Sequence, residues 1–196
     1  MEAKKRNILF VGNSYTFFND MPHAAFCEEA KAAGYDVQVT MITKGAHKLC
    51  QFADPEYEEG KRLREEINGK HYDCVVLQEQ SLTPIRNEEI FLKGVEDVKA
   101  LMDADKFVLY ATWGRNDGAK ALEDLNLTRE EMTEKLSKAY NKAAKRIGAR
   151  VAEVGKAFLA YGEAHDKDDL YNADKSHPSE LGSKIAAKVI LEQVIG

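Results

Sequence analysis

The sequence predicts an α/β protein with three layers, an α/β/α sandwich in which helices cover both faces of a central five-stranded parallel sheet. Short apolar runs without alternation, such as residues 8–11, are typical of strands that are buried on both faces. These runs alternate along the chain with longer segments of helical periodicity, which favours parallel strands joined by helices. A length of 196 residues suits one well-buried core, so we expect a single domain over residues 1–196.

Each expected strand is an apolar run that ends in glycine or in polar, turn-forming residues. With the first run in the centre and right-handed crossovers, the carboxyl ends of the first three strands lie side by side. The five runs are residues 8–11, 37–42, 74–77, 107–111 and 150–154.

The clearest helix is expected after Thr128, because Thr128 and Glu131 have the spacing of a capping box and Gly148 follows the last apolar position. Other helices are expected where a start signal precedes apolar residues at helical spacing. They cover residues 19–34, 55–69, 87–102 and 157–161, and the segment after Pro178.

The composition argues against several classes of function. A net charge of -5 with interleaved lysines, arginines and acids provides no basic stripe, so no nucleic-acid partner is expected. No stretch is long and apolar enough to span a bilayer, so no membrane partner is expected. Three widely spaced cysteines indicate neither a disulfide framework nor a zinc site. We therefore expect a cytoplasmic protein that needs no metal or cofactor.

The first candidate for chemistry is Ser14, which follows the first strand in the segment Gly12-Asn13-Ser14. In an open α/β sheet, the residues beyond the carboxyl end of a central strand lie in the crevice where ligands bind. The same three residue types are also common in ordinary turns. Because a serine is a poor nucleophile without a base, the hypothesis of a nucleophile requires a histidine.

Of the five histidines, His177 is the best candidate for that base. Asp174 precedes it by three residues, and the pair lies in the last loop, just before the final helix. The spacing alone is weak, since roughly one chain in three of this composition has such a pair by chance. An alternative is that Asp174 and Ser176 only cap that helix. His47 follows Gly45 and could line the same crevice.

Taken together, these segments resemble the SGNH (GDSL-like) hydrolase superfamily over nearly the whole chain. The resemblance implies an α/β/α esterase or acyl hydrolase that uses no metal or cofactor. Many members of the superfamily act on carbohydrate or other small O-acyl esters. The matching features are Gly12-Asn13-Ser14 after the first strand, Gly45 after the second, a polar segment after the third and Asp174-x-x-His177 before the last helix.

The resemblance also implies roles for individual residues. Ser14 would be the nucleophile, His177 the general base and Asp174 the acid that orients it. The backbone N–H groups of Ser14 and Gly45 would bind the oxyanion. Candidate walls of the substrate pocket are Tyr15, His47, Trp113 and Tyr171, although a lone aromatic residue near a strand end, such as Trp113, is usually part of the core.

Two segments depart from the pattern of the superfamily. Asn13 stands where the first motif usually has an aspartate, and it can make similar turn hydrogen bonds. The third block normally supplies an asparagine side chain to the oxyanion, whereas this chain has Gln78 and Gln80. A glutamine amide is an equally good donor. We favour Gln80, which lies further out toward the crevice, and retain Gln78 as the alternative.

The expected function is hydrolysis of small O-acyl esters, acetyl esters above all and those on carbohydrates included, by a Ser-His-Asp mechanism. One alternative is a flavodoxin-like domain, in which Gly12-Asn13-Ser14 would hold a phosphate or flavin at a helix N-terminus. That alternative explains neither Gly45 nor Asp174-x-x-His177. Another is a carbohydrate-binding relative without activity. The identity of the substrate, its acyl length and the oligomeric state do not follow from the sequence.

Overall fold

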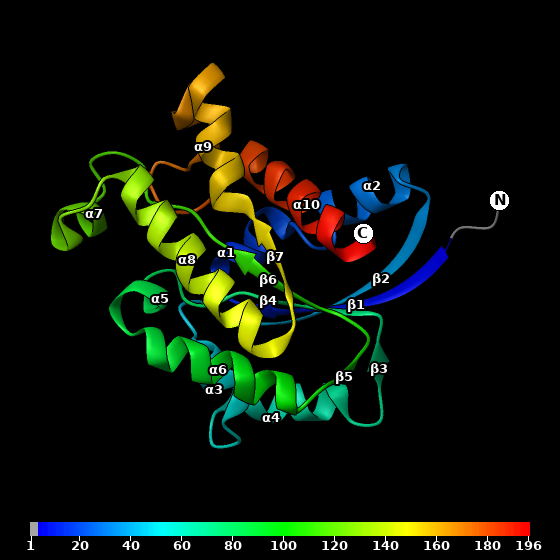
Figure 1. The fold of residues 1–196 in the computed structure, drawn as a ribbon. Coiled ribbons are helices and arrows are strands. Elements are labelled where there is room, and N and C mark those ends of the chain that lie inside the picture. The colour runs from blue at the N-terminus through cyan, green and yellow to red at the C-terminus, as the bar shows by residue number, and fades with distance from the viewer. Residues whose placement is uncertain (1–3) are drawn as a thin grey trace.

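A computed structural model describes residues 4–196 and contains the expected parallel sheet of five strands in the order β2-β1-β4-β6-β7 (Figure 1). This order of the chain's five main strands is that of a flavodoxin-like sheet. The strands are β1 (Lys4–Gly12), β2 (Tyr35–Thr43), β4 (Cys74–Leu77), β6 (Phe107–Ala111) and β7 (Arg150–Glu153).

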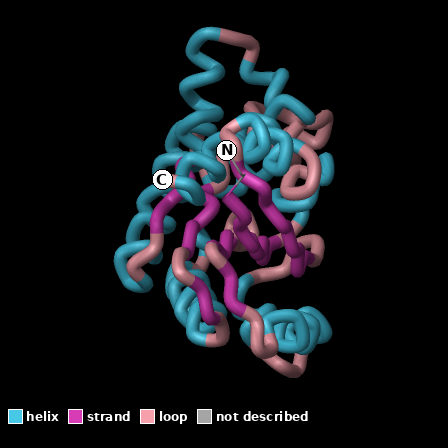
Figure 2. Tube along the Cα trace, turned by 90° about the vertical axis from the view of Figure 1, so that its right-hand side faces the viewer, coloured by secondary structure: helices cyan, strands magenta, loops and turns pink. Residues whose placement is uncertain are grey.

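Helices cover both faces of this sheet, which confirms the three-layer α/β/α architecture. Alternate residues of each strand point to opposite faces, so Ile8 and Phe10 join one apolar cluster while Leu9 and Val11 join the other. The first cluster includes residues of the helices α2 (Ala25–Ala32), α9 (Val154–Ala164) and α10 (Glu180–Ile195). The second includes residues of α3 (Leu49–Ala53), α4 (Glu58–Ile67), α6 (Glu88–Ala100) and α8 (Arg129–Ile147). Figure 2 shows the strands between these groups of helices.

Helix α8 begins and ends where the sequence predicts. At the start of α8, Thr128 Oγ1 accepts a hydrogen bond from Glu131 N at 3.1 Å, while Glu131 Oε2 accepts one from Thr128 N at 2.9 Å. Gly148 ends this helix with a φ of 67°. The helices are α1 (Ser14–Phe17), α2 (Ala25–Ala32), α3 (Leu49–Ala53), α4 (Glu58–Ile67), α5 (Thr83–Arg86), α6 (Glu88–Ala100), α7 (Lys120–Leu125), α8 (Arg129–Ile147), α9 (Val154–Ala164) and α10 (Glu180–Ile195), with short 3-10 helices η1 (Phe18–Asp20) and η2 (Lys167–Leu170).

The register of the sheet brings the carboxyl ends of its strands to one edge. Gly12 is paired with Thr43 of β2, and Val11 with Leu77 of β4. Leu77 is in turn paired with Leu109 of β6. The segments that begin with Ser14, Lys44, Gln78 and Thr112 therefore leave the sheet side by side.

The prediction of one helix over residues 19–34 is wrong. The chain instead makes α1, the turn η1 and then the shorter helix α2. Asn19 and Asp20 have φ angles of 54° and 49°, which interrupt the helical path. The Asn19 side chain does not cap a helix but donates to Pro178 O at 3.0 Å and Ser183 Oγ at 2.9 Å, and so ties this turn to the start of α10.

One further sheet lies outside the main one. A second, two-stranded parallel sheet pairs β3 (His71–Tyr72) with β5 (Asp103–Ala104), and neither strand has a clear signal in the sequence. Within residues 4–196, every helix is too short or too polar to cross a bilayer.

Candidate active site

Ser14, His177 and Asp174 meet at the carboxyl edge of the sheet in one hydrogen-bonded line. Ser14 Oγ lies 2.8 Å from His177 Nε2, and His177 Nδ1 lies 2.5 Å from Asp174 Oδ2. A proton on Nδ1 is the arrangement that the carboxylate favours, because the carboxylate can only accept. Nε2 is then unprotonated and faces the serine hydroxyl.

The loop between η2 and α10 positions the histidine and its acid. Asp174 Oδ1 accepts hydrogen bonds from the backbone N–H groups of Ser176, at 3.0 Å, and His177, at 2.9 Å. Although burial raises the pKa of Asp174, the hydrogen bonds from the His177 side chain and from these backbone groups hold that pKa below its ordinary value. The N-cap of α10 is Ser179, which accepts from Gly182 N at 3.1 Å, so the alternative that Asp174 or Ser176 caps this helix is wrong.

Ser14, the candidate nucleophile, is the first residue of α1, and Asn13 is the N-cap of this helix. Asn13 Oδ1 accepts from Tyr15 N at 3.3 Å, as the sequence predicts for a turn residue, and Asn13 Nδ2 donates to His47 O at 3.1 Å. An aspartate could not make the second bond, because its carboxylate has no donor. Asn13 therefore links the serine turn to the loop that contains Gly45.

Two backbone N–H groups near the Ser14 side chain have no hydrogen-bond acceptor in residues 4–196. Ser14 is the first residue of its helix, so its N–H has no partner within the helix. Neither Ser14 N nor Gly45 N donates to an acceptor among residues 4–196. A Cβ built at Gly45 would meet no atom within 4 Å, so the glycine leaves open space beside its own N–H.

The buried carboxylate of Glu59 holds both sides of the Gly45 loop. Glu59 of α4 is only 4% exposed and lies 3.3 Å from Lys44 Nζ and 3.1 Å from His47 Nε2. These two residues flank the turn, in which Ala46 has a φ of 61°. Burial raises the pKa of Glu59, but hydrogen bonds and the nearby cations outweigh it and lower that pKa, so the carboxylate stays charged. His47 therefore supports the loop through Glu59.

The two candidate glutamines play different parts. Gln78 is 1% exposed, and its Oε1 accepts from Asn13 N and Thr16 Oγ1, both at 2.9 Å, while its Nε2 donates to Glu79 O. The Gln78 side chain therefore makes its hydrogen bonds within the protein, where it holds the turn that contains Ser14. Gln80 Oε1 accepts from the backbone N–H groups of Leu82 and Thr83. Gln80 Nε2 has no hydrogen-bond acceptor in the described part of the chain.

Glu79 lies between these glutamines and is fully buried. It connects the loop that follows β4 to the start of α3, where the loop after β2 ends. Its carboxylate accepts from Leu49 N, at 3.2 Å, and from Gln80 N, at 2.6 Å. Burial raises the pKa of Glu79 to about 7, although these backbone hydrogen bonds and Lys48 lower it. The sequence offered no sign that a carboxylate at this position is buried.

Buried aromatic side chains pack beneath the site. Trp113 is 0% exposed and lies in a stack between Tyr15, with ring centroids 4.7 Å apart, and Phe158, at 4.3 Å. Tyr171 is also buried and donates its hydroxyl to Gly114 O at 2.9 Å. Three of the candidate pocket walls, Tyr15, Trp113 and Tyr171, are therefore part of the core beneath the crevice. Phe18, which sequence reasoning missed, stacks on the His177 ring at a centroid distance of 4.3 Å.

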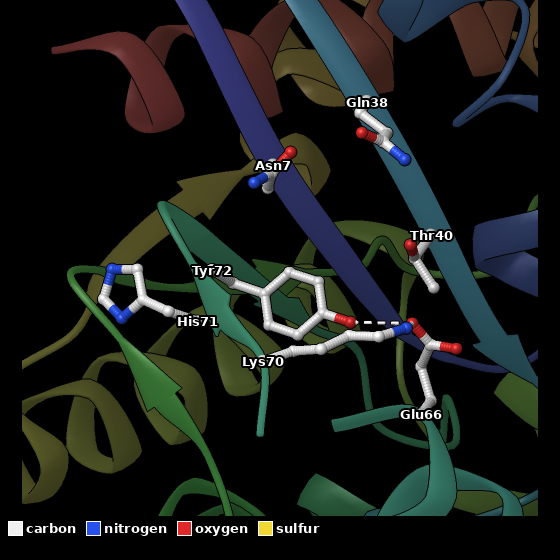
Figure 3. Close-up of a pocket in the computed structure, with 7 residues that line it drawn as sticks. All are labelled: Asn7, Gln38, Thr40, Glu66, Lys70, His71 and Tyr72. Atoms are coloured by element: carbon white, nitrogen blue, oxygen red, sulfur yellow. Dashed lines mark hydrogen bonds and ion pairs between the residues drawn. The ribbon is translucent and has the colours of Figure 1, made fainter. Parts of the chain in front are cut away.

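A separate polar cavity of about 220 Å³ is lined by residues of β1, β2, α4 and β3 and by Lys70 (Figure 3). In this cavity, Glu66 accepts hydrogen bonds from Lys70 Nζ at 2.6 Å and from Tyr72 Oη at 2.9 Å. None of the residues proposed for chemistry lines it. The lining residues are Asn7, Gln38, Thr40, Glu66, Lys70, His71 and Tyr72.

No protein-family model and no curated protein matches the sequence. Among solved structures, a DUF4886 family protein from Bacteroides uniformis shares the fold with a TM-score of 0.81 and 17% identity, over 97% of this chain and 83% of that one. The acetyl xylan esterase AlAXEase shares it with a TM-score of 0.67 and 15% identity, over 95% and 98%.

A third structure carries more weight, because its sequence is also similar. It is described as a candidate SGNH hydrolase from Slackia heliotrinireducens and is 30% identical, with a TM-score of 0.83. The match covers 99% of this chain and 100% of that one. The protein described here therefore belongs to the SGNH hydrolase family of carboxylic ester hydrolases.

Proposed function

We propose that the protein hydrolyses short-chain O-acyl esters, acetyl esters above all, with Ser14 as nucleophile, His177 as general base and Asp174 as the residue that orients the histidine. The observation that carries this proposal is the line of two short contacts from Ser14 Oγ through the His177 ring to Asp174. A nucleophile, a base and an orienting acid at these distances are what acyl transfer requires.

In this mechanism, Ser14 Oγ attacks the ester carbonyl carbon as its proton passes to His177 Nε2. Asp174 stabilises the imidazolium that forms, and the N–H groups of Ser14 and Gly45 bind the oxyanion. His177 then gives its proton to the departing alcohol, which leaves an acyl group on Ser14. A water molecule, deprotonated by His177, releases the acid and restores the serine.

The preference for a short acyl group rests on the packing beneath the nucleophile. Tyr15, Trp113 and Phe158 are buried against one another there. A long acyl chain would have to displace this aromatic stack, at a cost of several kcal/mol. The acetyl xylan esterase that shares the fold agrees with this preference. Esters on carbohydrates are the natural substrates that we favour.

The test is a series of 4-nitrophenyl esters of increasing acyl length, combined with covalent labelling. We expect kcat/KM to be highest for acetate and to fall steeply beyond butyrate. A fluorophosphonate should inactivate the protein and form a single adduct, which peptide mass spectrometry should locate on Ser14. An adduct on another residue would contradict the role of Ser14. A preference for long acyl chains would contradict the proposed substrate class.

Gln80 is proposed as the third donor to the oxyanion. Gln80→Glu keeps an oxygen that can accept from Leu82 N and Thr83 N but removes the Nε2 donor. Because the oxyanion carries its charge only in the transition state, kcat should fall by roughly 10² to 10³ while KM changes little. Steady-state kinetics with an acetyl ester check this. An unchanged kcat would mean that two backbone N–H groups suffice.

A further inference from the structure

Four polar side chains form a network beside the triad, which we call the Arg115 cluster and which consists of Tyr15, Ser81, Arg115 and Ser176. Arg115 Nη2 donates to Ser81 Oγ at 2.7 Å. Tyr15 Oη and Ser176 Oγ share a hydrogen bond of 2.9 Å. The guanidinium carbon of Arg115 lies 5.2 Å from the centre of the Tyr15 ring, which joins the two pairs.

Each hydroxyl-bearing member of the Arg115 cluster is the immediate chain neighbour of a residue proposed for catalysis. Tyr15 follows Ser14, Ser81 follows Gln80, and Ser176 precedes His177. Neighbouring Cα atoms are only about 3.8 Å apart. Arg115 itself follows β6, while Gly45 follows β2, and the order of the sheet places these strands on opposite sides of β1. The cluster thus lies on the side of the nucleophile away from the Gly45 loop.

The charge of Arg115 has no counterpart inside the protein. Among residues 4–196, Arg115 forms no ion pair, and its partly buried side chain has a buried Nε without a hydrogen-bond partner. Arg129, which is more deeply buried, also has one nitrogen without a partner, Nη1, but it pairs with Glu130 at 3.0 Å. The half-buried Arg64 donates to the backbone oxygens of Ala53 and Gly60. Charged groups withdrawn from water are normally paired.

The rest of the Arg115 cluster does not supply the missing negative charge. The serine hydroxyls are neutral. Burial raises the pKa of the Tyr15 phenol, although the guanidinium and the hydrogen bonds lower it, so the phenol is protonated at neutral pH. One positive charge surrounded by three neutral hydroxyls matches a single negative charge on a bound molecule. The planar fork of a guanidinium suits a carboxylate.

We propose that Arg115 selects ester substrates whose non-reacting part carries a carboxylate, which would bind at the Arg115 cluster while the ester carbonyl lies at Ser14. This inference rests on the proposed esterase function and adds the substrate class. An overall net charge of -5 would otherwise disfavour an anionic substrate. A preference for the anionic member of a matched pair of esters is therefore informative.

Two matched pairs of esters test which half of the substrate carries the carboxylate. For the acyl half, 4-nitrophenyl hydrogen succinate is compared with 4-nitrophenyl methyl succinate. For the alcohol half, 4-acetoxybenzoate is compared with its methyl ester. We expect the wild-type protein to favour the carboxylate in at least one pair by roughly tenfold or more in kcat/KM, mostly through KM, since a remote contact holds ground state and transition state alike.

Variants assign the preference to the side chain. Arg115→Gln should reduce the ratio of kcat/KM values within that pair to about one, and Arg115→Lys, which keeps the charge without the fork, should retain only part of it. Arg150→Gln removes an exposed arginine of β7 and should keep the wild-type ratio. Circular dichroism establishes that each variant is folded, and the Lys variant serves if the Gln variant is not.

The outcomes separate this inference from the proposed function. If no ester is hydrolysed in a manner that depends on Ser14, the esterase proposal fails. If the esters are hydrolysed but the wild-type protein favours neither carboxylate, or if Arg115→Gln keeps the preference, the esterase proposal stands and the role of Arg115 is refuted. A preference that disappears in Arg115→Gln and persists in Arg150→Gln supports it.

Discussion

Alanine at Ser14 or at His177 should lower kcat for an acetyl ester by on the order of 10⁴ to 10⁶, and the double variant should be no slower than either single one. The two side chains act as one unit, because the hydroxyl that lies 2.8 Å from His177 Nε2 is a nucleophile only while that nitrogen takes its proton. Without either member, the remaining rate reflects binding and the oxyanion donors alone.

Burst kinetics with 4-nitrophenyl acetate and steady-state rates measure this effect. His23→Ala is a matched control, because His23 is an exposed histidine that also pairs with an aspartate three residues away, Asp20, at 3.0 Å. It should keep the wild-type rate. A double variant that is much slower than both single variants, or a His177→Ala protein with more than about 1% of the wild-type kcat, would exclude the shared role.

The same mechanism requires the neutral His177 imidazole as the base, so kcat/KM should have an acidic limb on which it rises with pH. Asp174→Asn removes the carboxylate that favours the imidazolium, so the acidic limb should move to lower pH and the plateau should fall. Because Glu79 has a pKa of about 7, the profile is repeated in Glu79→Gln. A limb that survives in this variant does not come from Glu79.

The sequence predicted the sheet and the proximity of Ser14, Asp174 and His177 because both depend on local patterns. Apolar runs without alternation located β1, β4 and β6, and shorter or alternating apolar patterns located β2 and β7. The residues that follow β1 and precede α10 are brought together by the topology of the parallel sheet. Ser14, Asp174 and His177 lie on two such segments, so no side-chain packing had to be known to place them together. The capping box of Thr128 and Glu131 is likewise contained in four consecutive residues.

The remaining features depend on contacts between distant segments. Glu59 reads as one more charge on a solvated helix, yet it is buried because Lys44 and His47 lie against it. Asn19 reads as a helix start, but its side chain binds Pro178 and Ser183, more than 150 positions away. No periodicity within either segment records such a partner. For the same reason the sequence left open which way Gln78 and Gln80 point.

Glu79→Gln should make the protein more stable at pH 8 and change the pH dependence of unfolding. In the folded protein the pKa of Glu79 is raised from 4.5 to about 7, chiefly by burial. Between these pH values the folded chain keeps a proton that the unfolded chain has released, so the contribution of Glu79 to stability is fully present below pH 4.5 and is lost as pH rises through 7. The loss amounts to about 3 kcal/mol.

A glutamine copies the protonated form of Glu79, with one acceptor oxygen for Leu49 N or Gln80 N and one donor end, and it has no charge to bury. Urea unfolding at pH 5 and pH 8 therefore gives the measurement. Relative to the wild-type protein, the variant should gain about 2 to 3 kcal/mol in its free energy of unfolding between the two pH values. Glu65→Gln removes an exposed carboxylate of α4. Its free energy of unfolding should change between the two pH values by the same amount as that of the wild-type protein. If the free energy of unfolding of Glu79→Gln also changes with pH as that of the wild-type protein does, the buried carboxyl group does not change its protonation on unfolding in this range. The link that Glu79 forms between the start of α3 and the loop after β4 is then not sensitive to pH.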